Sequence, residues 1–514
     1  MTMKKRCAVL LFTALLMLIL SACGQGNPSG TTSAKPASGA EARKAANEIN
    51  VGIAQDLSSS LGPYQLATAG TREVMFNVFE GLYKVDPSGD FKPALATGHS
   101  LSADGLVYTF SIREGVKFHN GAVMTPQDVI YSFQTCASSS VDSSIKKVLA
   151  NVTDLKEEGG KVVLTLAVPD SDFLAYVSSV YISPAAYTEQ DTKPIGTGPF
   201  RFESRTVQDS VVLSRFDQYW GEKAALSRVT FKIFENINAM ITALKADSLD
   251  LACHLDINQT SSLSKDYSVL EGSMNLVQAL YLNHEYEPLK DIRVRQALNY
   301  AVDVDAMLKL TAEGHGHKLG TSIYPAFKKY FDESLVNAYP YNPEKAKSLL
   351  KEAGYPNGFT LTITVPGNYT PHVNTGMVLA EQLKAVGIEA VVQEVEWNTW
   401  LTDVYQGHKF EATVCGFDAS TLTAGALLGR YESTSSKNMC SYKGERFDGL
   451  LKEALATTDD ARRTELFKSA ARCLSEDAVN VYLQDLAEYV ALRSTLKGFT
   501  FYPLYVMDLS KVSY

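Results

Sequence analysis

The chain has 514 residues, of which 45% are hydrophobic and 20% are charged, and its formal net charge is -9. A chain of this length is too long to fold around one hydrophobic core, so we expect two or three structural units. The excess of acidic residues argues against nucleic acid as a partner and against electrostatic docking on anionic lipid, because both depend on basic surface.

The N-terminus has the pattern of a secretory signal. Three basic residues at 4–6 precede an apolar run over 8–20, which is shorter than the roughly 20 residues of a membrane span. The run ends in Leu20-Ser21-Ala22-Cys23-Gly24, which resembles a bacterial lipobox. We therefore predict a signal peptide over 1–22 and a lipid attached to Cys23. A plain signal peptide with an incidental cysteine is the alternative.

The segment 23–47 is predicted to be a flexible, lipid-anchored linker. It is rich in Gly, Ser, Ala, Thr and Pro, with almost no large apolar side chain. Such a segment cannot bury enough surface to offset the entropy of its ordering. The folded part is thus expected on the outer face of the cell membrane, attached through the lipid only, and on the periplasmic side in a Gram-negative cell.

The body of the chain alternates strands and helices, which predicts an α/β architecture. Thr125-Pro126-Gln127-Asp128 is typical of a helix start, because Thr suits the N-cap, Pro the first turn and Asp the third position. Helices are also expected over 343–353 and 375–386. Alternating or apolar runs predict strands over 49–54, 107–112, 161–168, 229–234, 360–365 and 389–395.

Five cysteines remain after Cys7 and Cys23 are set aside: Cys136, Cys253, Cys415, Cys440 and Cys473. The odd number leaves at least one of them unpaired, and the sequence has no C-x-x-C motif of a zinc ribbon or redox site. Small buried side chains are the default interpretation, with a Cys415–Cys440 disulfide left open.

A long segment in the first half carries a family resemblance. Residues 96–121 read ATGHSLSADGLVYTFSIREGVKFHNG. Further landmarks follow in order: GTGPF at 196–200, YWG at 219–221, DIRVRQAL at 291–298, YNP at 341–343 and AGYP at 353–356. Together these segments resemble the peptide/nickel class of bacterial extracellular solute-binding proteins, family 5. We expect most of these landmark residues to be structural and not to contact ligand.

The resemblance implies a two-lobe fold of the type II periplasmic-binding-protein kind, with the ligand enclosed between the lobes. The first lobe is expected over 48–283, with 490–514 returning to it, and the second over 284–489. The implied function is to capture a small solute, most often short peptides, for the permease and ATPase subunits of an ABC importer. The resemblance further implies a monomer, no cofactor and no enzymatic activity.

Three segments correspond to the ligand contacts of the family: 57–64, 366–374 and 414–430. The candidate ligand-binding residues are Tyr64, Asn368, Tyr369, Trp397, Trp400, Phe417, Asp418, Ser420 and Arg430. For Trp397 and Trp400, which lie three residues apart on an expected helix, core packing is the alternative.

The third segment departs from the family pattern. Peptide-binding members show Gly-Trp, two residues and then the Asp that pairs with the ligand ammonium group. Here Phe417 stands at the Trp position, Ser420 at the Asp position, and the acid, Asp418, comes two residues early. A two-residue shift keeps the side-chain face of an extended segment, so Asp418 is the candidate amine anchor, with a capping or turn acid as the alternative.

Arg430 is the candidate for a ligand carboxylate, because a guanidinium binds carboxylates through two parallel hydrogen bonds. A surface arginine at a helix end is the alternative. A nickel or metal-chelate ligand is the second hypothesis, with His372 and His408 as weak candidates. No nucleophile elbow, phosphate loop or dinucleotide motif is present. A secreted peptide hydrolase and a ligand-sensing lipoprotein remain alternatives of other classes.

Overall fold

The computed structural model describes residues 39–66, 68–141, 143–234, 236–419 and 421–514. The proposed signal peptide, the lipid attachment site Cys23 and Ser420 lie outside the described residues. Within these ranges, no helix is both long enough and apolar enough to cross a bilayer. Residues 39–514 form one compact unit.

The first lobe is built on a seven-stranded mixed sheet with the order β12-β19-β11-β1-β10-β9-β8. Strand β1 lies at its centre and pairs in parallel with both β10 and β11. The strands are β1 (Glu48–Ile53), β8 (Phe200–Thr206), β9 (Ser210–Arg215), β10 (Arg228–Ile233), β11 (Leu251–Leu255), β12 (Tyr267–Ser273) and β19 (Ala487–Arg493). Its helices are α1 (Gly39–Ala46), α2 (Ala69–Met75), α6 (Ile237–Lys245) and α7 (Ile257–Thr260).

A four-stranded antiparallel sheet, β4-β5-β7-β6, completes the first lobe together with the β2–β3 hairpin. Helix α3 begins as predicted, since the Thr125 backbone N–H donates to Asp128 Oδ2 at 2.9 Å. The strands are β2 (Tyr83–Val85), β3 (Phe91–Pro93), β4 (Ala96–Leu101), β5 (Val107–Ile112), β6 (Val152–Glu158) and β7 (Lys161–Leu166). The helices are α3 (Pro126–Ser139), α4 (Ser143–Leu149) and α5 (Phe173–Ser178).

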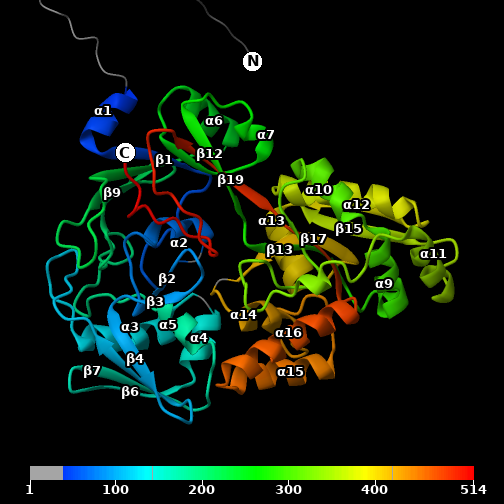
Figure 1. Ribbon diagram of the computed structural model, residues 1–514, viewed down its shortest axis with the longest axis horizontal. Helices are drawn as coiled ribbons and strands as arrows, with labels where there is room; N and C mark the ends of the chain where they lie inside the picture. The colour runs from blue at the N-terminus through cyan, green and yellow to red at the C-terminus, as the bar shows by residue number, and fades with distance from the viewer. Residues whose placement is uncertain (1–38, 67, 142, 235, 420) are drawn as a thin grey trace, which may run out of the picture. The chain divides into compact units, whose positions relative to one another are not determined.

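The second lobe is built on a six-stranded sheet with the order β14-β18-β13-β17-β15-β16 (Figure 1). Separate hydrophobic clusters involve the alternate side chains of β13 and β17, so both faces of this sheet are covered. The strands are β13 (Leu276–Leu282), β14 (His317–Lys318), β15 (Thr360–Pro366), β16 (Glu389–Val395), β17 (Ala412–Asp418) and β18 (Asn480–Asp485).

The helices of the second lobe divide between those two faces. One cluster packs on α9 (Ile292–Ala301), α10 (Val304–Ala312), α11 (Pro343–Glu352) and α12 (Thr370–Lys384), and the other on α14 (Ala424–Leu428), α15 (Glu445–Ala456) and α16 (Asp460–Glu476). The short helices are α8 (Glu287–Lys290), α13 (Trp397–Thr399), η1 (Glu333–Leu335), η3 (Gly429–Tyr431) and the π-helical turn η2 (Trp400–Gln406). Helix α12 starts five residues before the predicted 375, because Pro371 suits a first turn.

The chain passes between the lobes twice. Strand β12 ends at Ser273 and β13 starts at Leu276, while β18 ends at Asp485 and β19 starts at Ala487. The two passages touch, since the Met274 backbone N–H donates to the Leu486 carbonyl at 2.9 Å. The expected boundary at 283 therefore assigned β13 to the wrong sheet. The apolar run of β13 pairs with β17 and β18 in the centre of the second-lobe sheet.

The five cysteines outside the N-terminal segment are all buried, and none of them forms a disulfide with another. A Cys415–Cys440 disulfide is therefore not formed. The Cys440 thiol instead donates to Asn480 Oδ1 at 3.2 Å. The default interpretation of these cysteines as small core residues is the one that the structure supports.

Candidate functional site

A cavity of about 310 Å³ lies between the two lobes. The first lobe supplies most of its wall, from segments 63–66, 72–85, 140–145 and 178–181, and the C-terminal segment supplies 504–506. Asp418 and Ala419, at the end of β17, line it from the second lobe. Both lobes thus contribute residues to one cavity, which is the expected geometry of a ligand site.

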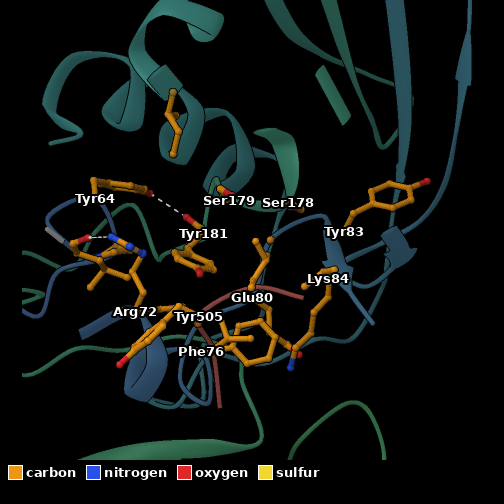
Figure 2. Close-up of a pocket in the computed structure, with 18 of the residues that line it drawn as sticks. Tyr64, Arg72, Phe76, Glu80, Tyr83, Lys84, Ser178, Ser179, Tyr181 and Tyr505 are labelled. Carbon is orange, nitrogen blue, oxygen red and sulfur yellow. Dashed lines mark hydrogen bonds between the residues drawn. The ribbon is translucent and has the colours of Figure 1, made fainter. Parts of the chain in front are cut away.

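The first-lobe wall is largely aromatic. Phe79 and Tyr181 stack with their ring centres 5.7 Å apart, and Phe76 and Tyr505 lie beside them (Figure 2). Tyr64, a predicted site residue, lies in this wall. Its hydroxyl donates to the Tyr181 carbonyl at 3.1 Å, and burial raises the pKa of that hydroxyl. Tyr64 therefore contributes its aromatic ring to the cavity wall, because its hydroxyl group is already hydrogen-bonded.

Charged side chains lie in both walls of the cavity. Arg72, on α2, and Lys84, on β2, belong to the first lobe, and Asp418 belongs to the second. Lys84 Nζ lies 4.3 Å from the centre of the Phe76 ring and 3.8 Å from Asp508 Oδ2. Asp418 is exposed and forms no ion pair with any residue that the structure describes. The second-lobe carboxylate is thus available to a ligand.

Glu80, a buried carboxylate in the first-lobe wall, was missed by the sequence analysis. It accepts hydrogen bonds from the Tyr219 hydroxyl at 2.7 Å, the Trp220 indole N–H at 2.7 Å and the Thr197 hydroxyl at 3.0 Å. Burial raises the pKa of Glu80, an effect that Lys84 and the three donors oppose. The local sequence Phe79-Glu80-Gly81 contains no motif that would identify Glu80 as a site residue. Its donors, however, belong to the GTGPF and YWG landmarks, whose structural role therefore includes fixing this carboxylate.

The second lobe carries a continuous series of aromatic rings beside β17, here called the aromatic chain. It consists of Tyr369, Trp397, Trp400, Tyr405, Phe417 and Tyr281, with successive ring centres 5.1 to 6.0 Å apart. Trp400 is only 2% exposed, and its indole N–H donates to Thr413 Oγ1 at 3.0 Å. Trp400 is thus a core residue, the alternative that the sequence left open. Tyr369 and Trp397 are half-buried, and Asn368 is exposed. None of the four lines the interlobe cavity.

Arg430 lies against the aromatic chain and not in the cavity wall. Its guanidinium carbon is 3.7 Å from the centre of the Phe417 ring. Its Nε and Nη1 atoms are buried without a hydrogen-bond partner among the described residues. The surface arginine that was the alternative is therefore excluded. Phe417 and Asp418 are neighbours in β17, so their side chains point to opposite faces of the sheet. Arg430 thus lies on the face away from Asp418.

The two candidate metal ligands do not come together. His372 is buried, and its Nδ1 lies 2.8 Å from Gln278 Nε2, while the carbonyl of His408 accepts from Asn283. Gln278 in β13 and Asn283 directly after this strand are five residues apart, which is roughly 16 Å at ~3.3 Å per residue of extended chain. Burial lowers the pKa of His372 to about 4. No group of three or more His, Cys, Asp or Glu side chains suited to a metal occurs among the described residues.

A second interlobe contact, here called the latch, joins the loop before α5 to α15 and α16, which lie on one side of the second lobe (Figure 1). The Ser171 backbone N–H donates to the Leu455 carbonyl at 3.2 Å, and Arg463 Nη1 donates to the Ser171 carbonyl at 3.0 Å. Asp172 is buried in the same contact. Burial and the neighbouring Asp170 raise the pKa of Asp172 to about 6, against the effect of Arg463. The latch joins loop 170–172 of the first lobe to α15 and α16 of the second, so the lobes are closed on each other.

Two α/β lobes, joined by two chain passages and closed around a shared cavity, define a two-lobe binding protein of the periplasmic type. The family model described as bacterial extracellular solute-binding proteins, family 5 Middle, matches residues 90–439. The chain therefore belongs to this family of extracellular solute-binding proteins.

Several known proteins resemble the chain over most of its length. The glutathione-binding protein GsiB of Pectobacterium atrosepticum is 30% identical, over 87% of this chain and 90% of that one. Heme-binding protein A of Haemophilus influenzae is 27% identical over 94% of both. The solved structure of the ABC transporter-associated protein DppA from Helicobacter pylori, in complex with peptide STSA, has a TM-score of 0.76 at 25% identity. It covers 91% of this chain and 98% of its own.

These findings confirm three predictions. The family is that of the resemblance, the fold is the two-lobe type II fold, and the protein is a solute-binding protein of the class that serves ABC importers. The family is extracytoplasmic and works with permease and ATPase subunits. The lipid anchor, the monomeric state and the absence of enzymatic activity stay predictions.

Proposed function

We propose that this protein captures short peptides outside the cell and delivers them to an ABC importer. The observation that carries this proposal is the carboxylate of Asp418, which forms no ion pair among the described residues and lines the interlobe cavity. Such a group suits the ammonium end of a peptide. A volume of about 310 Å³ is at the lower end of small-molecule pockets, which span ~300–1,000 Å³. The size therefore favours a ligand of a few residues.

The proposal includes the attachment of the protein to the membrane. After removal of 1–22, a lipid on Cys23 would hold the folded part on the outer face of the cell membrane. The linker predicted over 23–47 would end earlier than expected, because residues 39–46 form α1 of the first lobe. The protein acts as a monomer and meets the permease in its closed, liganded form. The support for this is the sequence pattern of the N-terminus together with the extracellular family of the folded part.

Replacing Asp418 by asparagine tests the peptide proposal. The protein is titrated by calorimetry with a panel of di- and tripeptides. Asp418→Asn removes the negative charge at constant shape, so we expect peptide affinity to fall by roughly 10- to 100-fold, since charge-assisted hydrogen bonds contribute ~1.5–3 kcal/mol. Glu389→Gln, at an exposed position of β16, serves as the control and leaves affinity unchanged. A wild-type protein that binds no peptide of the panel, or an Asp418→Asn variant with unaltered affinity, contradicts the proposal.

The latch predicts how fast ligand is released. Arg463→Gln removes a charged donor from the Ser171 carbonyl, a bond that exists only between closed lobes. We expect ligand dissociation, measured by stopped-flow fluorescence, to accelerate roughly tenfold. Arg462→Gln is the matched control, because Arg462 pairs with Glu453 inside the second lobe at 2.7 Å. Equal dissociation rates for the two variants would show that the latch does not hold the closed state.

A further inference from the structure

We propose that the protein takes up a proton from solution when its lobes close, and that the carboxylate of Asp172 in the latch is the group that binds it. Closure, and with it the capture of a ligand, is then favoured as the medium becomes more acidic. The inference goes beyond the proposed function, because it concerns the closing movement and applies to any ligand that the interlobe cavity receives. The proton site lies outside that cavity, since Asp172 is not among the residues that line it.

The second lobe covers the side chain of Asp172. A Cβ added to Gly425 of α14 would lie 2.5 Å from Asp172 Oδ2, so the carboxylate packs directly on the second lobe. A first-lobe turn lies beside this contact, because a Cβ added to Gly105 would be 2.8 Å from Thr458 of the second lobe and 3.3 Å from Pro169. Asp172 is only 8% exposed in this arrangement. Opening of the lobes separates Asp172 from Gly425 and brings the carboxylate into contact with water.

The carboxylate of Asp172 has no counter-ion within the part of the chain that the structure describes. Its Oδ2 is buried there without a hydrogen-bond partner. Arg463 is the cation of the latch, but its Nη1 donates to the Ser171 carbonyl at 3.0 Å and its Nη2 to Asp460 Oδ1 at 2.6 Å. These two bonds fix the guanidinium, and its ion pair is with Asp460 and not with Asp172. A buried carboxylate without an ion pair is more stable with its proton than without it.

The other charged and titratable groups around Asp172 leave a carboxylate pair as the site of proton uptake. Burial raises the pKa of the three tyrosines among them, so these stay neutral near neutral pH. A hydrogen bond from Lys329 lowers the pKa of Asp460, so that group stays negative. Burial raises the pKa of Asp170, which therefore titrates together with Asp172. The groups are Asp170 and Tyr176 beside Asp172 in the chain, Tyr108 of β5, Tyr330 before η1, and Asp460 and Arg463 of α16, whereas the contacts from α14 and α15, namely Thr423, Gly425 and Leu455, carry no charge.

The direction of the coupling follows from the two environments of Asp172. In the closed lobes, burial and the charge of Asp170 raise the pKa of Asp172 to about 6. In open lobes the carboxylate faces water, where the pKa of an aspartate is ~3.9. The closed form thus binds the proton more tightly than the open form. This stabilisation of the closed form is complete below about pH 3.9 and is lost as the pH rises through about 6.

Hydrogen–deuterium exchange of the ligand-free protein, resolved to single residues, tests the proposal. The Ser171 backbone N–H donates to the Leu455 carbonyl of the other lobe, so its protection from exchange reports the closed fraction. Each rate is divided by the intrinsic exchange rate at the same pH. We expect the protection of the Ser171 amide in the wild type to fall roughly tenfold between pH 5 and pH 7.5.

Two substitutions in the latch and one outside it make the test specific. Asp172→Asn keeps the shape of the side chain in an uncharged form, so protection of Ser171 should be roughly 10- to 100-fold above wild type at pH 7.5 and equal at both pH values. Asp170→Asn removes the neighbouring negative charge and should move the loss of protection to a lower pH. Asp154→Asn, at an exposed position of β6, is the matched control and should behave like the wild type. A native circular-dichroism spectrum shows that each variant is folded.

The sign of the Asp172→Asn effect decides between a proton site and a purely structural role. If Asp172 served only as a hydrogen-bond acceptor, asparagine would be the weaker acceptor and the protection of Ser171 would fall, which would overturn the proposal. Parallel losses of protection in the wild type and in Asp172→Asn, or a wild-type protection that does not change with pH, would overturn it as well. Because no ligand is present, each of these results leaves the peptide proposal intact.

Discussion

Replacing Glu80 by alanine is expected to lower the free energy of unfolding by about 3 to 5 kcal/mol, because one buried and two half-buried donors lose their acceptor and each unsatisfied group costs ~1–3 kcal/mol. The Thr197, Tyr219 and Trp220 side chains all donate to this carboxylate. Water cannot easily take the place of the lost carboxylate as an acceptor, since Glu80 is only 1% exposed. Glu80→Gln keeps the shape and one carbonyl oxygen, so its effect should be smaller.

Denaturant unfolding, followed by tryptophan fluorescence, measures this effect well. Trp220 is one of three tryptophans in the chain, and its indole contacts Glu80 directly. Glu114→Ala changes an exposed acid of the same landmark region and should alter stability by less than ~0.5 kcal/mol. A loss below about 1 kcal/mol in Glu80→Ala would mean that the three donors find other partners.

Replacing His254 by leucine is the second substitution with a large expected effect. His254 Nε2 lies 2.9 Å from Glu73 Oε1, and its Nδ1 lies 2.5 Å from Glu488 Oε1. Its ring also stacks on Tyr505, with 4.5 Å between the ring centres. Without the imidazolium, the buried carboxylate of Glu73 and the partly buried carboxylate of Glu488 lose their shared cation. We expect a loss of about 3 to 5 kcal/mol in the free energy of unfolding at neutral pH.

The ion pairs of His254 with Glu73 and Glu488 make the free energy of unfolding depend on pH. Burial alone would lower the pKa of His254, but Glu73 and Glu488 together raise it well above 6.5. The folded state thus binds the proton more tightly than the unfolded state. This contribution is complete below about pH 6.5 and is lost as the pH rises through the folded pKa.

Unfolding titrations at pH 6, 7.5 and 9 check this linkage. The wild-type protein should lose stability toward pH 9, and His254→Gln should show a flatter profile over the same range. His315→Gln is a suitable control, because His315 pairs with Glu271 at an exposed position. Parallel profiles for the wild type and His254→Gln would contradict the linkage.

Local sequence patterns predicted those elements whose causes are local. The capping residues Thr125 and Asp128 mark the start of α3, and the run 389–395 became β16 with the same bounds. The passage between lobes was placed wrongly, because β13 is fixed by its partners β17 and β18, which lie about 130 and 200 residues away in the sequence. The local sequence of a strand does not show which distant strands it pairs with.

The residues of the candidate site also fall into those that a local sequence pattern predicts and those that only the tertiary packing reveals. Asp418 was found because a family motif surrounds it, and Tyr64 because it follows the first strand. Arg72 and Glu80 become wall residues only through the packing of α2 and the turn after it against the C-terminal segment. Arg430 and Trp400 were candidates because their residue types suit ligands, whereas the packing around Phe417 and Thr413 places them in the second lobe's interior.

The burial of the five cysteines outside the N-terminal segment makes this protein suitable for optical sensing. All five are buried, and burial raises the pKa of the thiols of Cys253, Cys415 and Cys440, so little reactive thiolate is present near neutral pH. A maleimide dye should therefore leave these five thiols of the folded protein unmodified. One cysteine introduced on the surface of each lobe would then carry a donor and an acceptor fluorophore. Energy transfer between the two dyes would report domain closure in real time, without removal of any of these five cysteines.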